Sequence, residues 1–126
     1  MKNLGLNHIN LRVPREQLEV MRDFYCDVVE LSVGFRPAFD SQGYWLYASG
    51  HPVLHLSVFK APPATGFGKP MDHIAFSCVD VPHFEARLQS LGIAYRIEHF
   101  DDEGIVQIFI KDPVNNTVEL HFSAVA

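Results

Sequence analysis

Three histidines and one glutamate occupy matching positions in the two halves of this 126-residue chain, each beside apolar residues. His8 in "NHINL" aligns with His73 in "DHIAF", and this spacing of roughly 65 residues indicates an internal repeat. His55 in "VLHLSV" aligns with Glu119 in "TVELHF" when a small gap is allowed. Imidazole and carboxylate are ligands that suit Mn, Fe, Co, Ni or Zn. The four residues are therefore candidate ligands of one divalent metal.

A second interpretation of these residues is ordinary hydrogen bonding. His73 lies in "MDHIAFSC", a predicted strand, and a polar ring in a buried strand costs free energy unless it has a partner. That partner could be a metal or a hydrogen-bonding group, and histidines are often only intermediate in burial. The spacing alone leaves both interpretations open.

Hydrophobic periodicity predicts the order β-α-β-β-β for the first half of the chain. Apolar residues alternate in "LNHINLRV", and they recur at helical spacing after Pro14, which is suited to the start of a helix. The expected elements are a strand over 6–13, a helix over 15–31, and strands over 32–38, 44–49 and 53–59.

The second half repeats this order. The expected elements are a strand over 71–79, a helix over 81–92, and strands over 95–98, 105–111 and 117–122. Between the halves, "KAPPATGFGKP" contains prolines and glycines without periodicity, as linkers do. We therefore expect an α+β fold, with one domain over 1–126 made of a first module (about 1–60), a linker (61–70) and a second module (about 71–126).

Strand alternation assigns the side chains to two faces. One face of each strand is apolar and should pack beneath the helices, whereas the other face carries the candidate ligands. We therefore expect a curved sheet with helices outside and a polar cleft inside. Arg12 lies on the cleft face and could pair with a substrate carboxylate or phosphate, or be a plain surface residue.

Three further residues are candidates for contact with a substrate. Trp45 and Tyr47 share one face of a strand and could form an apolar wall, although aromatic residues at such positions also serve as core. His121 lies two residues after Glu119 on the same face, where it could act as a base or simply form a hydrogen bond.

Two motifs resemble those of a known family. "DFYCDVVEL" is similar to the end of the first helix in the vicinal oxygen chelate superfamily, with Glu30 where glycine is common. "DPVNNTVEL" is similar to that family's "DPDGNxxEL" motif, with Val114 and Asn115 in place of Asp-Gly. The superfamily includes glyoxalase I, extradiol dioxygenases, and fosfomycin- and bleomycin-resistance proteins. The resemblance covers essentially the whole chain and implies two βαβββ modules.

The resemblance also implies the ligands. It places the metal at His8, His73 and Glu119, with His55 at a fourth position that is a ligand in some members. The metal, whose identity is open among Fe, Mn, Ni, Co and Zn, binds two neighbouring oxygens of a small substrate and stabilises developing negative charge as a Lewis acid.

Three protein ligands leave room for a catecholate and O₂, whereas a fourth ligand leaves room only for a chelating substrate. His55 therefore favours a glyoxalase-like lyase or isomerase, with Glu119 as the catalytic base. An extradiol-type dioxygenase is the alternative, and a non-enzymatic bleomycin-type drug-binding protein is the second alternative.

Bulk properties exclude several classes. The net charge of −5, without a block of like charge, argues against nucleic-acid binding, and the apolar stretches are too short to span a bilayer. "MKNLGLNH" lacks the apolar core of a signal peptide. Cys26 and Cys78 are far apart in sequence, which is typical of reduced thiols in a cytoplasmic protein. By the resemblance we also expect a homodimer, with residues 60–70 as a hinge for module exchange.

Overall fold

A computed structural model describes residues 3–59 and 73–123 of the chain. The chain divides into two compact units, Met1–Gly66 and Phe67–Ala126. The predicted linker over 61–70 lies outside the described residues, and the assignment of 1–126 to a single domain stays a prediction. Within the described ranges, no helix is long and apolar enough to cross a membrane.

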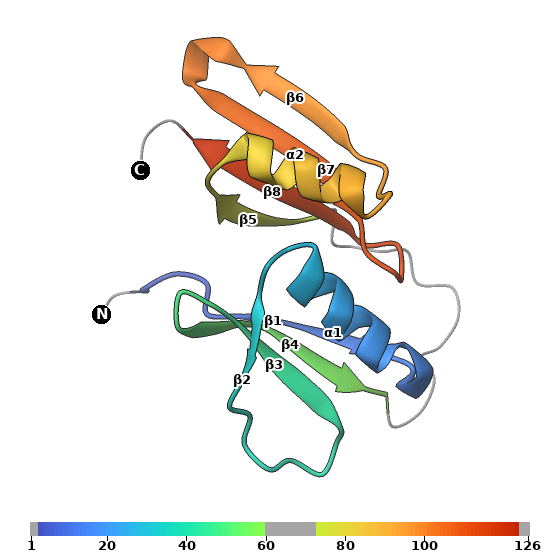
Figure 1. Ribbon diagram of the computed structural model, residues 1–126. Helices are drawn as coiled ribbons and strands as arrows, with labels where there is room; N and C mark the ends of the chain where they lie inside the picture. Colours follow the sequence, from blue (N-terminus) through green and yellow to red (C-terminus); the bar gives the residue numbers. More distant parts are fainter. Residues whose placement is uncertain (1–2, 60–72, 124–126) are drawn as a thin grey trace, which may run out of the picture. The chain divides into compact units, whose positions relative to one another are not determined.

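The first unit is a four-stranded mixed sheet with one α-helix, α1, packed on it (Figure 1). The strand order is β1-β4-β3-β2, in which β1 runs parallel to β4 and the other neighbours are antiparallel. The elements are β1 (Ile9–Val13), the 3₁₀-helix η1 (Arg15–Gln17), α1 (Leu18–Asp27), β2 (Ser32–Gly34), β3 (Gly43–Ala48) and β4 (His51–Val58).

The second unit has the same architecture. Its strand order is β5-β8-β7-β6, again with one parallel pair, β5 and β8, and two antiparallel pairs. The elements are β5 (Ile74–Cys78), α2 (Val81–Ser90), β6 (Arg96–Phe100), the 3₁₀-helix η2 (Asp101–Glu103), β7 (Ile105–Lys111) and β8 (Thr117–Ser123). The α+β class and the repeated β-α-β-β-β order are confirmed. One curved sheet and cleft formed by both units stays a prediction.

Both helices pack against the sheets of their units through their apolar faces. Leu18, Met21 and Tyr25 of α1 follow one another at three- and four-residue spacing and are buried, which is the pattern of an amphipathic helix on a sheet. In α2 the buried residues are Phe84 and Leu88. These faces cover the predicted apolar face of each sheet, so the polar face of each sheet lies on the side away from its helix.

Element ends differ from the sequence prediction where local backbone preferences intervene. The first α-helix is shorter than the expected 15–31, because it begins after a 3₁₀ turn and ends at Asp27. Glu30 then adopts a left-handed conformation with φ 67°, which explains why glycine suits this position. Strand β4 begins at His51, two residues before the expected start of this strand at residue 53.

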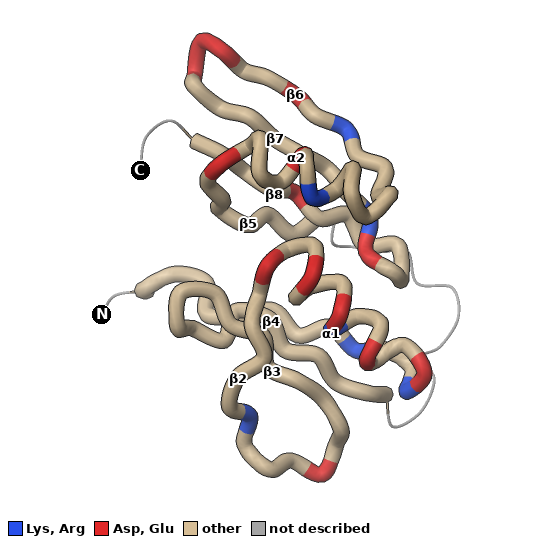
Figure 2. The backbone as a smooth tube through the Cα atoms, viewed as in Figure 1, with Lys and Arg blue, Asp and Glu red and all other residues tan. Residues whose placement is uncertain are grey.

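Figure 2 shows basic and acidic residues at positions along both units. Acidic residues outnumber basic ones, 15 to 10. In such a chain, an arginine without an acidic partner is therefore a candidate binding group.

Candidate functional site

Glu119 is a buried carboxylate held between two histidines. It lies on β8 with 5% of its surface exposed. One carboxylate oxygen, Oε1, lies 3.2 Å from Nε2 of His73, and the other, Oε2, lies 3.0 Å from Nδ1 of His121. A buried carboxylate needs such partners because burial without them is costly. His73 therefore has Glu119 as its partner, through a contact that suits either a hydrogen bond or shared metal ligation.

The position of His73 corrects one expectation. His73 is not inside a buried strand, because β5 begins one residue later, at Ile74, and 38% of the His73 side chain is exposed. The strand register then explains its contact with Glu119. In the parallel pair of β5 and β8, Glu119 lies opposite Ala75, and His73 comes two residues before Ala75.

His8 and His55 repeat this relation in the first unit. In the parallel pair of β1 and β4, His55 lies opposite Asn10, and His8 comes two residues before Asn10. The two imidazole rings stack with centroids 3.8 Å apart. The predicted equivalence of His55 with Glu119 is therefore visible in the geometry of each unit.

A third ring extends this stack. The indole of Trp45 on β3 lies parallel to the other face of His55, with centroids 4.0 Å apart and planes inclined by 9°. Trp45 and His55 are neighbours across the antiparallel pair. The stack fixes the plane of the His55 ring.

The surroundings of His55 disfavour its protonated form. Burial lowers its pKa, and His8, Arg36 and His51 lower the pKa further, while a hydrogen bond to the backbone of Pro52 raises it. The ring nitrogen Nε2 of His55 is buried and has no hydrogen-bond partner among the residues that the structure describes. A buried imidazole nitrogen without a partner among the described residues can serve as a metal ligand.

A cavity of about 210 Å³ lies beside these rings in the first unit. Its lining comes from β1, β3, β4 and the loop between β2 and β3, and it includes the predicted residues His8, Arg12, Trp45 and His55. The other lining residues are Asn10, Arg36, Phe39, Ser41, Leu56 and Ser57. The volume is below the roughly 300–1,000 Å³ of pockets for drug-sized molecules, so the cavity suits a small ligand.

Tyr47 does not line this cavity. Its hydroxyl donates a hydrogen bond to the carbonyl oxygen of Phe35 at 2.7 Å. Its ring covers Gly34, where an added Cβ would lie 2.5 Å from the tyrosine ring. The structure thus places Tyr47 against β2, and its predicted contact with substrate stays a prediction.

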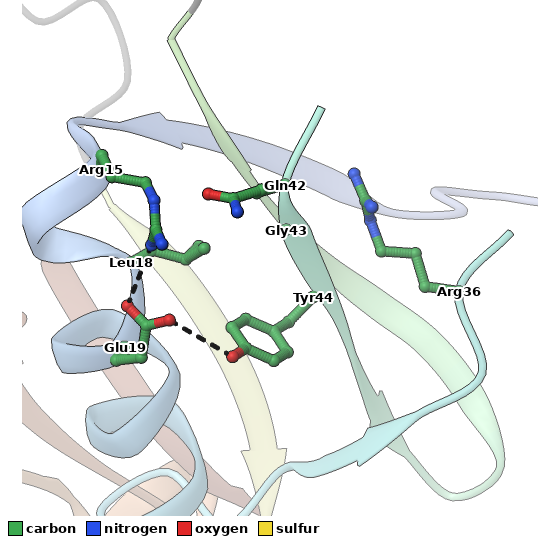
Figure 3. A pocket seen from close by; sticks show the side chains of 7 residues that line it. All are labelled: Arg15, Leu18, Glu19, Arg36, Gln42, Gly43 and Tyr44. Atoms are coloured by element: carbon green, nitrogen blue, oxygen red, sulfur yellow. Dashed lines mark hydrogen bonds and ion pairs between the residues drawn. The ribbon is translucent and has the colours of Figure 1, made fainter. Parts of the chain in front are cut away.

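Arg36 was not among the sequence candidates but lines the cavity. It follows β2, where a single arginine in an irregular segment carries no periodic signal. Arg36 also borders a second cavity of about 250 Å³ between α1 and β3, which is lined by Arg15, Leu18, Glu19, Arg36, Gln42, Gly43 and Tyr44 (Figure 3). In that view Arg36 lies across Gly43 from the residues of α1.

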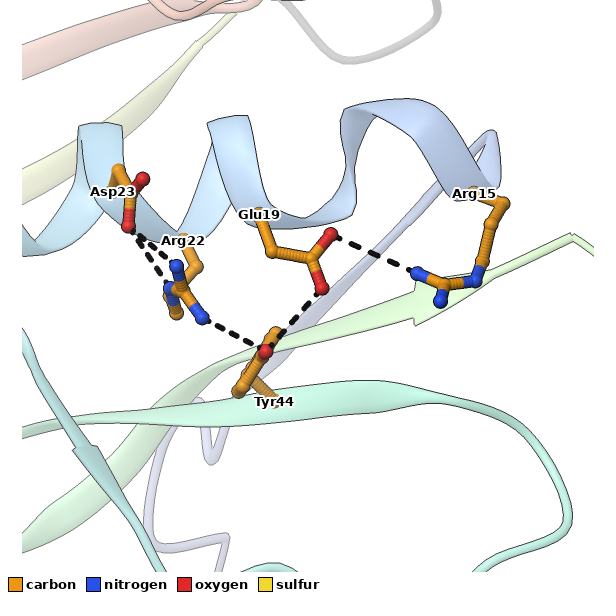
Figure 4. Close-up of polar contacts among 5 residues, drawn as sticks. All are labelled: Arg15, Glu19, Arg22, Asp23 and Tyr44. Carbon is orange, nitrogen blue, oxygen red and sulfur yellow. Dashed lines mark hydrogen bonds and ion pairs between the residues drawn. The ribbon is translucent and has the colours of Figure 1, made fainter.

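Charged groups of η1 and α1 near this second cavity are paired with one another (Figure 4). Arg15 lies 3.7 Å from Glu19, and Arg22 lies 2.9 Å from Asp23. The hydroxyl of Tyr44 accepts a hydrogen bond from Arg22 at 2.8 Å. The hydrogen bond with Asp23 raises the pKa of Arg22. These interactions fasten α1 to β3.

The residues of both units fit a divalent metal by donor type. Two donor atoms about 2.1 Å from one ion, at right angles to each other, lie about 3.0 Å apart. The 3.2 Å between His73 Nε2 and Glu119 Oε1 is close to that value. Among the residues that the structure describes, no group of three or more His, Cys, Asp or Glu side chains is gathered to hold an ion. Each unit thus supplies two candidate ligands, which we call the first half-site (His8 and His55) and the second half-site (His73 and Glu119).

Comparison with known proteins identifies the family. The sequence profile of the Glyoxalase/Bleomycin resistance protein/Dioxygenase superfamily matches residues 5–120. The chain belongs to this superfamily, as the two motifs implied. Glyoxylase I 4 of Arabidopsis thaliana is 26% identical over 122 residues, which make up 92% of this chain and 69% of that protein.

Solved structures share the fold at low identity. A glyoxylase/bleomycin resistance protein/dioxygenase domain from Frankia sp. EAN1pec has a TM-score of 0.78 at 19% identity, over 99% of this chain and 96% of that chain. A mutant of the fosfomycin resistance protein FosX from Listeria monocytogenes, complexed with Mn(II) and 1S,2S-dihydroxypropylphosphonic acid, has a TM-score of 0.71 at 18% identity, over 98% and 95% of the two chains.

Proposed function

We propose that this protein is a metal-dependent enzyme of the vicinal oxygen chelate type, acting as a lyase or isomerase on a small substrate with two adjacent oxygens. The observation that carries the proposal is Glu119, a buried carboxylate with an imidazole at each oxygen. A carboxylate in this position is costly for a protein that uses it only for stability. Its retention is explained if it binds a cation and moves a proton.

The proposed ligands are His8, His73 and Glu119, with His55 as the fourth. Support for His55 comes from its unpartnered buried Nε2. The FosX mutant of this fold was crystallised with Mn(II), which supports a divalent ion without fixing its identity. When bound, the ion supplies Lewis-acid stabilisation of negative charge that develops on the substrate oxygens.

Proton transfer is assigned to Glu119 and His121. The hydrogen bond from His121 to Oε2 orients the carboxylate, whose other oxygen faces His73. A proton taken from the substrate would stay on Oε1 of Glu119, while the N–H group of His121 at Oε2 keeps the carboxyl group oriented. This pairing of a carboxylate with a histidine suits general acid–base catalysis near neutral pH.

His55 also bears on the choice of reaction. If His55 is a ligand, a six-coordinate ion keeps two positions for a chelating substrate and none for O₂. If His55 is free, the two-histidine, one-carboxylate set is that of ring-cleaving oxygenases. Substrate-dependent O₂ consumption by the Fe-loaded protein would favour the dioxygenase, and turnover under strict anaerobiosis favours the lyase or isomerase.

Metal analysis tests the proposal. The wild-type chain, purified without chelator or His-tag, should carry about one equivalent of a transition metal, and Glu119→Gln should lose it because an amide is a much weaker ligand than a carboxylate. Glu98→Gln is the matched control, since Glu98 lies in β6 and pairs with Arg96. A wild-type protein that carries no metal and binds none on addition would contradict the proposal and favour a drug-binding protein.

A further inference from the structure

We propose that the cavity beside His8 and His55 binds an oxyanion group of the substrate, a carboxylate or a phosphonate, through the guanidinium groups of Arg36 and Arg12. This inference rests on the proposed function, because it assumes that the substrate enters this cavity. It adds the substrate class and a specificity residue, Arg36.

The environment of Arg36 is that of a binding group rather than of an ion pair. Its Nη1 donates to the backbone carbonyl of Ser41 at 3.0 Å, and its Nη2 donates to the hydroxyl of Ser41 at 3.2 Å. Its Nε is buried and has no hydrogen-bond partner within residues 3–59 and 73–123. The guanidinium carbon also lies 4.9 Å from the centre of the Phe39 ring. These contacts hold the guanidinium in place and leave its charge uncompensated.

Other arginines in the described residues show the contrast. Arg15, Arg22 and Arg96 each lie beside a carboxylate. No ion pair joins Arg36 or Arg12 to an acidic residue in the described ranges, and the cavity that both arginines line contains no Asp or Glu. In a chain with a net charge of −5, two arginines without acidic partners at one small cavity create a local excess of positive charge.

Gly43 is part of this arrangement. A Cβ at Gly43 would lie 2.9 Å from Nη2 and 3.1 Å from Cζ of Arg36. The absence of a side chain at Gly43 therefore lets the guanidinium lie against β3 beside the cavity. A planar guanidinium fixed in this way can present N–H groups to two oxygens of one anion.

A carboxylate and a phosphonate share the chemistry that two arginines recognise. The cavity also has an apolar wall, Phe39 and Trp45, so the expected ligand combines an oxyanion with a small apolar part. Benzoate and phenylphosphonate are suitable probes of the two classes, and benzyl alcohol is the neutral counterpart. The single tryptophan of the chain, Trp45, lines the cavity and reports binding by its fluorescence.

The experiment is a fluorescence titration of chelator-treated protein with the three probes. We expect saturable binding of at least one anion and none of benzyl alcohol over the same range. Arg36→Met and Arg12→Met should each weaken anion binding about tenfold or more, as expected for loss of a charge-assisted hydrogen bond. Arg96→Met, which removes an arginine of β6, should bind as wild type does. Tighter binding of phenylphosphonate than of benzoate, or the reverse, assigns the class of oxyanion.

The inference is overturned if neither anion binds, if benzyl alcohol binds as well as the anions, or if both arginine variants bind as wild type does. Should Arg36→Met fail to fold, Arg12→Met carries the test, since the Arg12 side chain makes no hydrogen bond or ion pair with the described residues. Because the titration uses metal-free protein, its result is independent of metal binding. A protein that holds a metal but binds no anion refutes this inference alone, and one that binds the anion but no metal refutes the proposed function alone.

Discussion

Replacement of Asp112 by alanine should destabilise the loop that joins β7 to β8. The Asp112 side chain, which is 5% exposed, accepts hydrogen bonds at Oδ1 from the backbone N–H groups of Val114 and Asn116, at 3.0 and 2.8 Å. Its Oδ2 accepts a third bond from the Asn116 side chain at 2.9 Å. The loop sets the β7–β8 register that places Phe109 opposite Glu119, so the prediction concerns the scaffold of the second half-site.

The expected cost follows from these three bonds. Each contributes about 1 kcal/mol to the free energy of unfolding, so Asp112→Ala should cost about 3 kcal/mol. Asp112→Asn retains an oxygen for the two backbone donors and loses the acceptor for the Asn116 side chain, so it should cost about 1 kcal/mol. The ratio of the two costs tests the assignment of hydrogen bonds better than either value alone.

Urea unfolding followed by circular dichroism measures both costs. Asn115→Gly is the matched control in the same loop, because Asn115 has φ 70° and glycine adopts this conformation without strain. The control should retain wild-type stability within about 0.5 kcal/mol. Equal costs for Asp112→Asn and Asp112→Ala would refute the reasoning, as would a cost below about 1 kcal/mol for Asp112→Ala.

Three other predictions concern packing, reactivity and assembly. Gly43→Ala would place a Cβ 2.1 Å from the carbonyl oxygen of Leu56, and it should cost about 1–3 kcal/mol in urea unfolding; unchanged stability would contradict the packing. Burial and the neighbouring Asp27 raise the pKa of the Cys26 thiol, and Arg22 opposes this effect. Iodoacetamide should therefore alkylate Cys26 more slowly than a free thiol. The alkylation rate should continue to increase with pH above the ordinary thiol pKa of about 8.5. Peptide mass spectrometry measures this rate, and reaction at the free-thiol rate at pH 8 would contradict it. We also expect a homodimer in sedimentation velocity; a 14.3 kDa species alone at micromolar concentration would contradict that.

The internal repeat could be predicted because it depends on local sequence patterns. His8 and His73 precede similar apolar strands, and the parallel strand pairs then place them near His55 and Glu119, respectively. Period-two alternation was enough to assign these residues to the polar face of each sheet. The fold class followed from the same patterns.

Features that depend on tertiary packing were not predictable in this way. The exposure of His73 depends on where β5 begins, and a strand pattern does not fix the first residue of a strand. The stack of His8, His55 and Trp45 depends on neighbours from three strands. Arg36 lies in a segment without periodicity, and only its contact with Ser41 and its place at the cavity distinguish it from a surface arginine.

The central claim is that Glu119 binds a metal together with His73. Diffraction from crystals soaked in Mn(II), with anomalous scattering recorded for the ion, tests it most directly. The account predicts one anomalous peak within about 2.3 Å of both Glu119 and His73. A soaked crystal in which Glu119 remains bonded to His73 and His121, with no anomalous peak beside it, would contradict the claim.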